Sequence, residues 1–419
     1  MLSVLIAATA AAALPPYEPP PMFNITASNS YDAGLQHGKL AGSRIRGWLK
    51  TDEMQNIIKY IKTADGAAAF SRMQKENTAA FPYLVRELEG MAKGAAVAVD
   101  DIWACTMINE LESLMTNGGG QWPPAPNATT IQNKENVDLR AGHCSDVYAV
   151  ADGGASKGFA HGHNEDWPGP IFQFWYFVAY TASADANDTD PSFGSCAGMV
   201  YPGGLVGWAG SWNSHGVYLT QNSLFPLRTL AGGLSSAFMQ RDALCNPKTA
   251  SKGLDAIIDA MTKKKPRADD KAGGLVGWSS GASINIVSLK EVRMANIEVH
   301  EDKHGVYELP IHKEPTAGLN YSHFNMYKHL EVGIADAPSN STMHRQARMD
   351  SLPPPRSVHD VKSHLSDAAD TAYPIFRNMT LATLVLDGKS GKLDVWCCHH
   401  ASLGGGPPQY SWVVPGFFA

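Results

Sequence analysis

The residues best suited to covalent chemistry lie in one segment, AGHCSDVYAVADGGASKGFAHGHNEDW, at 141–167. A single cysteine, Cys144, precedes an alternating run typical of a strand, and a second such run ends in two histidines, an asparagine and two carboxylates. A lone cysteine is more often a small buried apolar residue than a nucleophile. Here its neighbours Ser145 and Asp146 are polar, which favours a reactive thiol at a sheet edge.

A cysteine nucleophile needs a base, because a free thiol is mostly protonated at neutral pH. His143, His161 and His163 are candidates by their position in the sequence. Cleavage at the His143–Cys144 bond would supply a different base, the new α-amino group of Cys144, which titrates near about 7.7–8. The residues alone leave both bases open.

Helices are predicted before this cysteine and strands after it. Three early segments carry apolar residues at helical spacing: 51–62 (capped by Thr51 or Asp52), 82–96 and 99–115 (opened by an aspartate cap). Residues 116–140 are rich in Gly, Pro and Asn and indicate an exposed linker. Strand patterns dominate after Cys144, including 172–180 and 203–212, and helical segments interrupt them at 235–246, 252–263 and 357–366. This order favours α+β layers over a βαβ repeat.

Composition limits the class of function. The 419 residues, 44% of them apolar, can bury one large core or two ordinary ones. A net charge of −6, from 34 basic and 40 acidic residues, offers no polycation for nucleic acid. After the N-terminus no apolar run approaches the ~20 residues of a membrane span. We therefore expect no nucleic-acid partner and no transmembrane segment.

The N-terminal segment and the glycosylation sequons predict a secreted or lysosomal glycoprotein. Residues 1–14 have an apolar core followed by small residues, which is typical of a secretory signal. Six cysteines are too few for a disulfide scaffold, although one or two bridges can form among Cys105, Cys196, Cys245 and the adjacent Cys397 and Cys398. Glycans are expected on five N-x-S/T sequons, at Asn24, Asn127, Asn187, Asn340 and Asn378. A sixth sequon lies at Asn320, and a glycan there would exclude that residue from the site.

Four segments resemble the penicillin acyltransferase-like family of N-terminal-nucleophile hydrolases, which includes isopenicillin N acyltransferase and the N-β-alanyl-dopamine hydrolases. They are YDAGLQHGKLAGSRI at 31–45, FPYLVRELEGMAKGAAVAVDDIWACTMINEL at 81–111, GHCSDVYAV with HGHNEDW at 142–167, and ATLVLDGKSGKLDVW at 382–396. Together they span nearly the whole chain in the family's order.

The resemblance implies a four-layer αββα sandwich with a helical N-terminal segment, made as a precursor that cuts itself before Cys144. Three parts are then expected: a signal peptide at 1–14, a helical chain with the linker at 15–143, and a catalytic chain at 144–419. The two mature chains would remain together as a heterodimer, with the Cys144 thiol as nucleophile and its new amine as base. The linker would let the new terminus move clear of the site.

The resemblance also implies catalytic roles, position by position. Asp166 matches an aspartate that in relatives contacts the amine of the nucleophile, and Asn164 matches the asparagine of the same motif. His163 stands where bile salt hydrolases have arginine. Asn213 and Asn222 resemble a turn and a polar strand end where an amide donates to the developing oxyanion, a contact worth about 3–4 kcal/mol.

Further assignments are less direct. Ser322 occupies the position at which the family usually has an asparagine, and Asn320 lies two residues before it. Arg377 resembles an arginine that supports the site, and His143 stands where the penicillin acyltransferases have glycine. The expected substrate-binding side chains are His163, Trp167, Trp212, Asn320 and Ser322.

We therefore expect an enzyme that attacks a small N-acyl amine or amino-acid amide with Cys144, forms a thioester and passes the acyl group to water. Two alternatives stay open: an acyl-CoA-dependent N-acyltransferase, and a non-catalytic secreted glycoprotein that retains the fold. A zinc site from His161, His163 and the run at 397–400 is disfavoured, because the spacing is not that of usual ligand pairs. No cofactor and no metal are expected.

Overall fold

The computed structural model describes residues 18–117, 144–167, 169–183, 194–224, 226, 229–269, 273–312, 319–332, 340–397 and 406–418. The predicted signal peptide at 1–14 lies outside the described residues, as does the linker beyond Asn117. So do the cleavage residue His143 and the sequons at Asn127 and Asn187.

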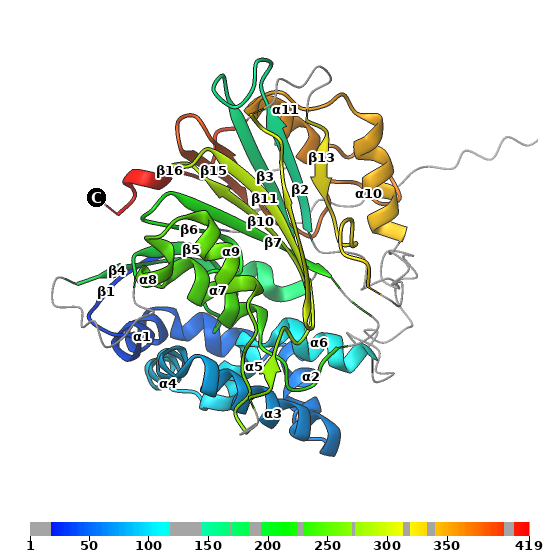
Figure 1. The fold of residues 1–419 in the computed structure, drawn as a ribbon. Coiled ribbons are helices and arrows are strands. Elements are labelled where there is room, and N and C mark those ends of the chain that lie inside the picture. Colours follow the sequence, from blue (N-terminus) through cyan, green and yellow to red (C-terminus); the bar gives the residue numbers. More distant parts are fainter. Residues whose placement is uncertain are drawn as a thin grey trace, which may run out of the picture.

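Two β-sheets lie face to face and helices cover both outer sides (Figure 1). The eight-stranded sheet runs, in spatial order, β1 (Met22–Ala27), β4 (Tyr176–Ala182), β5 (Cys196–Val200), β6 (Ala209–Asn213), β7 (Val217–Leu224), β10 (Gly281–Ser288), β11 (Arg293–His300) and β12 (Lys303–Glu308). The six-stranded sheet runs β13 (Tyr321–His323), β2 (Cys144–Val150), β3 (Phe159–Asp166), β14 (Thr380–Asp387), β15 (Lys392–Cys397) and β16 (Tyr410–Val413). A separate pair joins β8 (Lys265–Pro266) to β9 (Leu275–Val276).

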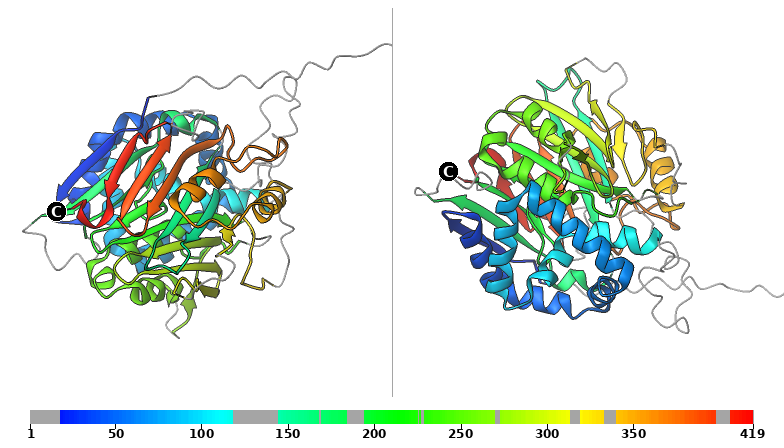
Figure 2. Two further views of the ribbon diagram at one scale, coloured as in Figure 1. Left: turned by 90° about the horizontal axis from the view of Figure 1, so that it is seen from above. Right: turned by 60° about the horizontal axis from the view of Figure 1, so that its bottom comes forward.

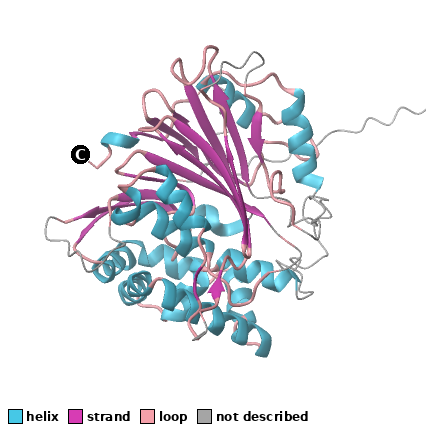
Figure 3. Ribbon diagram, in the orientation of Figure 1, coloured by secondary structure: helices cyan, strands magenta, loops and turns pink. Residues whose placement is uncertain are grey.

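The helices form two outer layers. On the side of the eight-stranded sheet lie α1 (Ser30–Leu49), α2 (Asp52–Tyr60), α3 (Ala64–Ala80), α4 (Pro82–Ala95), α5 (Val99–Thr106), α6 (Ile108–Asn117), α7 (Ser236–Cys245), α8 (Pro247–Ala250) and α9 (Leu254–Thr262). On the other side lie α10 (Asn340–Ser351) and α11 (Val358–Leu365), the latter against β2, β3 and β14. Since β7 contacts β2 and β6 contacts β3, the sheets meet at their centres. Figures 2 and 3 show the same layers from other sides and by element type. The predicted αββα sandwich is confirmed.

Local sequence explains most elements, with three differences from the prediction. Thr51 caps α2 by accepting a hydrogen bond from the backbone N–H of Met54, as expected. The helix predicted at 99–115 is instead two helices, because Met107 leaves the helical backbone at φ −101° and ψ 24°, and the cap of the first is Ala98. The strands predicted at 172–180 and 203–212 both begin later, after a 3₁₀ turn at Gly169–Gln173 and a turn before Ala209.

The N-terminal part is not purely helical. Strand β1 joins the edge of the eight-stranded sheet and pairs in parallel with β4, from Met22 opposite Phe177 to Ala27 opposite Ala182. No residue pattern singled this strand out, because only Ile25 and Ala27 are buried in it. A disulfide between Cys196 and Cys245 joins β5 to the end of α7. Among the helices the structure describes, none is both long and apolar enough to cross a membrane.

Helices α1 and α4 touch along their backbones through glycines of the two N-terminal motif segments. A Cβ atom at Gly34 would lie 1.9 Å from the carbonyl oxygen of Glu87, and one at Gly90 would lie 2.1 Å from that of Tyr31. Because real Cβ atoms never come so close to backbone, any side chain at these positions must push the helices apart.

Replacing Gly90 with alanine is therefore expected to destabilise the protein by about 1–3 kcal/mol, the usual result of overpacking. Thermal unfolding followed by circular dichroism measures the effect. Gly416→Ala is the matched control, since a Cβ there meets nothing within 4 Å. Equal unfolding midpoints for the two variants would contradict the close helix contact.

His37 fixes α1 to the eight-stranded sheet. Its Nδ1 lies 2.7 Å from the hydroxyl oxygen of Tyr180 and its Nε2 lies 2.7 Å from that of Tyr176, both on β4. The ring is fully buried. Burial, assisted by the charge of Arg241, lowers the pKa of His37 from 6.5 to about 3.

This lowered pKa makes stability depend on pH. Below pH 6.5 the histidine of the unfolded chain is protonated, whereas His37 of the folded chain stays neutral down to about pH 3. The free energy of unfolding therefore falls as the pH drops from 6.5 to about 3. At pH 5 the loss amounts to about 2 kcal/mol. Urea unfolding at pH 7 and pH 5 should show a smaller difference for His37→Gln than for the wild type; an unchanged difference would mean that His37 is not the titrating group.

Candidate active site

The nucleophile candidate Cys144 opens β2, which lies between the short edge strand β13 and β3 in the six-stranded sheet. Strand β2 pairs with β3 in antiparallel register, with Cys144 opposite Glu165 and Asp146 opposite His163. Alternate side chains of a strand share a face, so these four lie on one face of the sheet. It is the face toward the other sheet, because Asp146 receives hydrogen bonds from β7.

Asp146 is the centre of this face. Its Oδ1 accepts hydrogen bonds from Nε2 of His161 at 2.7 Å and from the hydroxyl of Thr220 at 2.6 Å. Its Oδ2 accepts from Nδ1 of His163 at 2.8 Å and from the amide of Asn222 at 2.7 Å. Burial favours the neutral acid, but the charge of His163 and the two histidine hydrogen bonds outweigh it and hold the pKa of Asp146 well below its usual range. The group is therefore a buried carboxylate.

His163 lies between two carboxylates. Its Nε2 is 3.0 Å from Oε2 of Glu165, while Nδ1 is on Asp146. Although burial opposes a charged ring, the charge of Asp146 and the hydrogen bonds to Asp146, Cys144 and Glu165 raise the pKa of His163 well above 6.5. This histidine thus keeps the positive charge that the resemblance assigns to an arginine at its position.

The thiol of Cys144 lies beside Glu165. Its Sγ is 3.9 Å from Oε1 of Glu165, an oxygen that also accepts a hydrogen bond from the hydroxyl of Tyr201. Burial and the negative charge of Glu165 raise the pKa of the Cys144 thiol to about 12, against the opposing effect of His163. In the uncut chain this thiol is therefore protonated at neutral pH.

Two residues that the sequence did not indicate hold the backbone of Cys144. Its N–H donates to Oδ1 of Asn325 at 3.3 Å, and its carbonyl oxygen accepts from Nη1 of Arg345 at 2.6 Å. Arg345 also donates to Asn325 at 3.0 Å, so the two side chains act as one unit. Asn325 lies three residues beyond Ser322, so the motif position at Ser322 is a sequence signal that points to its neighbourhood. Arg345, on α10, carried no signal in the sequence.

Asp166 and Arg377, two of the predicted catalytic residues, are brought together by the structure. Arg377 Nε lies 3.0 Å from Oδ2 of Asp166, and the hydroxyl of Thr380 donates to Oδ1 at 2.6 Å. Burial raises the pKa of Asp166, an effect that the charges of Arg377 and Arg345 partly offset. Asp166 ends β3 on the face opposite Glu165, at the same end of the strand pair as Cys144.

The predicted asparagines are engaged elsewhere. Asn164 donates to the carbonyls of Leu365 and Ile375 on the helix-facing side of β3. Asn213 organises the turn between β6 and β7, where its side-chain oxygen accepts from the backbone of His215 and Val217. Asn222 lies near the site, but its amide donates to Asp146 and, at 3.5 Å, to the carbonyl of His323. In this structure, none of the three directs an open amide at the thiol.

Of the predicted substrate-binding residues other than His163, one lies near the thiol and three do not. Trp167 packs against Tyr201 with ring centroids 5.1 Å apart, and so lines the region beside Glu165. Trp212 lies instead in an aromatic cluster with Trp412, at 5.2 Å. Ser322 faces α10 through Gln346, and Asn320 is exposed, so the structure does not bring them to the thiol. The sequons at Asn24, Asn340 and Asn378 are exposed.

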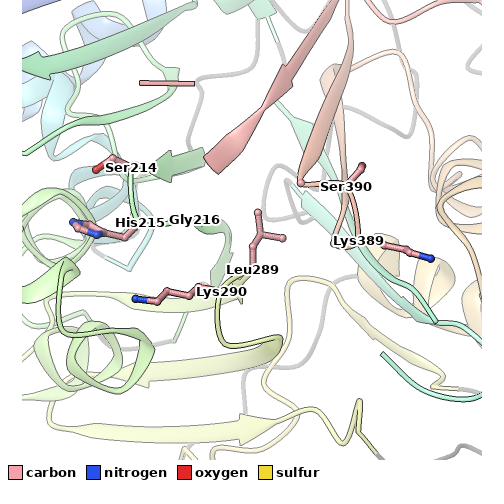
Figure 4. Close-up of a pocket in the computed structure, with 9 residues that line it drawn as sticks. Ser214, His215, Gly216, Leu289, Lys290, Lys389 and Ser390 are labelled. Carbon is pink, nitrogen blue, oxygen red and sulfur yellow. The ribbon is translucent and has the colours of Figure 1, made fainter. Parts of the chain in front are cut away.

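An open hollow of about 470 Å³ lies at the other end of the sandwich (Figure 4). It is lined by the turns at 214–216, 289–290 and 388–391. Because Phe159 and Gly388 meet at the end of β3 opposite Glu165, this hollow is remote from Cys144. The figure shows Leu289 between the turns that carry Gly216 and Ser390.

One curated protein is similar to this chain over most of its length. No family model matches the sequence. Among curated proteins, the chain is similar to β-alanyl-dopamine/carcinine hydrolase of Drosophila melanogaster, with 25% identity over 365 residues, which cover 84% of each chain.

Two solved variants of conjugated bile acid hydrolase from Clostridium perfringens give TM-scores of 0.32 and 0.34, at 8% and 9% identity. They cover 64% and 65% of this chain, and 96% and 98% of their own. The similarity to the Drosophila enzyme fits the penicillin acyltransferase-like family of N-terminal-nucleophile hydrolases, the family that the motifs resemble.

Proposed function

We propose that this protein is a self-processing amide hydrolase whose nucleophile is the thiol of Cys144. The observation that carries the proposal is the polar set around that thiol, formed by Glu165, His163 and the buried Asp146. Cys105 provides the contrast. It is also free and buried, but it belongs to the hydrophobic core.

The first reaction is cleavage of the chain itself. Sγ of Cys144 attacks the carbonyl carbon of His143, the C–S bond forms as the C–N bond breaks, and the thiol proton passes to the departing nitrogen. Water then hydrolyses the thioester, which leaves a carboxylate on His143 and a free amine and thiol on Cys144. The hydrogen bonds from Cys144 to Asn325 and from Arg345 to Cys144 support this step, because they hold the nucleophile in place on both sides of its own α-carbon.

Cleavage changes the electrostatics of the thiol. The new ammonium group adds a positive charge directly beside Sγ, and a nearby cation favours the thiolate. It therefore opposes the effect of Glu165, which raises the thiol pKa in the uncut chain. Once deprotonated, the same amine is poised to act as the base, since an α-amine titrates near about 7.7–8. The precursor is thus less reactive toward external substrates than the cut enzyme.

The two chains would stay associated after cleavage. Strand β1 of the first chain pairs with β4 of the second along its whole length. Helix α1 is fixed to β4 by His37, and side chains of both chains share one hydrophobic core. These contacts support a permanent heterodimer.

The substrate we propose is a small N-acyl amine, with water as acyl acceptor. The support is the name of the Drosophila relative, a hydrolase of β-alanyl-dopamine and carcinine. A secreted or lysosomal address is proposed on the predicted signal peptide, the exposed sequons and the Cys196–Cys245 disulfide.

Amine release from β-alanyl-dopamine, carcinine and a panel of amino-acid amides tests the proposal. We expect release by the wild type, a loss of at least about 10³-fold in Cys144→Ala, and activity within about two-fold of the wild type in Cys105→Ala. Cys105 is the matched control because it is also a buried free cysteine.

A wild-type protein that is inert on the whole panel would contradict hydrolysis of small N-acyl amines. Activity retained in Cys144→Ala would contradict the nucleophile. Transfer of the acyl group to an added amine in preference to water would favour the acyltransferase alternative.

A further inference from the structure

Three metal ligands of different chemistry meet at the start of β2. They are Sγ of Cys144, Nε2 of His163 and a carboxylate oxygen of Glu165, and the ligand atoms lie within 4.8 Å of one another. All three side chains come from the same face of two adjacent strands, and all three are buried. Thiolate, imidazole and carboxylate are the ligands that Zn²⁺ takes in proteins.

The spacing of these atoms comes close to that around a tetrahedral ion, with one pair slightly too far apart and one pair slightly too near. Zn²⁺ bonds sulfur at about 2.3 Å and nitrogen or oxygen at about 2.0–2.2 Å, so its ligand atoms stand about 3.3–3.8 Å apart. Here Sγ of Cys144 lies 3.9 Å from Oε1 of Glu165, and Nε2 of His163 lies 3.0 Å from Oε2. Small side-chain rotations are enough to place one ion among them.

The surroundings already orient these ligands. A histidine that binds a metal usually donates its other ring N–H to a carboxylate, and Nδ1 of His163 lies 2.8 Å from Oδ2 of Asp146. Asp146 is itself held by Thr220 and Asn222 of the facing sheet. The remaining ligand, Glu165, is held by the hydroxyl of Tyr201. The imidazole and the carboxylate are thus aimed before any ion arrives.

Negative groups surround the imidazole of this cluster. The two ring nitrogens of His163 lie 2.8 Å from Oδ2 of Asp146 and 3.0 Å from Oε2 of Glu165. On binding, Zn²⁺ takes the place of the thiol proton and of any proton on Nε2, and these protons leave to solvent.

We propose that Cys144, His163 and Glu165 form a Zn²⁺ site that reversibly blocks the thiol. Three protein ligands leave a fourth position for water. The consequence rests on the proposed function, because the atom that binds the ion is the nucleophile: while Sγ is bonded to zinc, neither self-cleavage nor attack on a substrate proceeds. The same three residues therefore provide a site at which zinc inhibits the enzyme.

Cobalt spectroscopy tests the site without relying on activity. The full chain as purified is treated with a chelator, dialysed and titrated with CoCl₂. We expect saturation at one Co²⁺ per protein molecule, whether cut or uncut, with a near-ultraviolet thiolate-to-cobalt band and visible bands of tetrahedral intensity. All of these bands should be lost when equimolar Zn²⁺ is added. His163→Gln and Glu165→Gln should each weaken binding at least about ten-fold, whereas Cys105→Ser should bind like the wild type.

Absence of the thiolate band in the wild type, or unchanged affinity in both His163→Gln and Glu165→Gln, would overturn the site. The wild-type titration needs no variant, so poor folding of a variant leaves the test intact. A chain that shows the cobalt bands but neither cuts itself nor hydrolyses amides keeps the site and contradicts the proposed function. An active enzyme without the cobalt bands would support the proposed function and contradict the zinc site.

Discussion

The rest of the site depends on the buried carboxylate of Asp146. It accepts hydrogen bonds from β3 through His161 and His163 and from β7 through Thr220 and Asn222, so one side chain ties the two sheets together. A buried charge persists only when it is paired and fully hydrogen-bonded. This requirement fixes β2, β3 and β7 in one arrangement, and the thiol, two residues from Asp146 on the same face, is placed with them.

Across the strands, one side of the space between the sheets is polar and the other is aromatic. From Asp146 the polar side continues through the amides of Asn222, Asn285 and Asn296, each bonded to the next across β7, β10 and β11. The aromatic side holds Trp212 and Trp412. Apolar burial stabilises the sandwich on one side, while the hydrogen-bond network on the other orients the groups around Cys144.

Elements whose partners are close along the chain could be predicted from the sequence. The nucleophile strand and the motif strand follow one another, so 144–166 could be predicted as a pair, and the cap at Thr51 follows from local chemistry. Arg345 could not be predicted, because it reaches Cys144 across 201 residues through tertiary packing, whereas Asn325, 181 residues from Cys144, lies only three residues beyond a motif position. Asn213 has the residue type expected of an oxyanion donor, but its amide satisfies the buried carbonyl of Leu244 instead.

The central claim is that Cys144 becomes a chain terminus by its own chemistry. Intact mass and N-terminal sequencing of the purified wild type, beside Cys144→Ala, test it most directly. The account predicts two chains in the wild type, one of them beginning Cys144-Ser145-Asp146, and a single uncut chain in the variant. A single chain in both, or the same two chains in both, would contradict it.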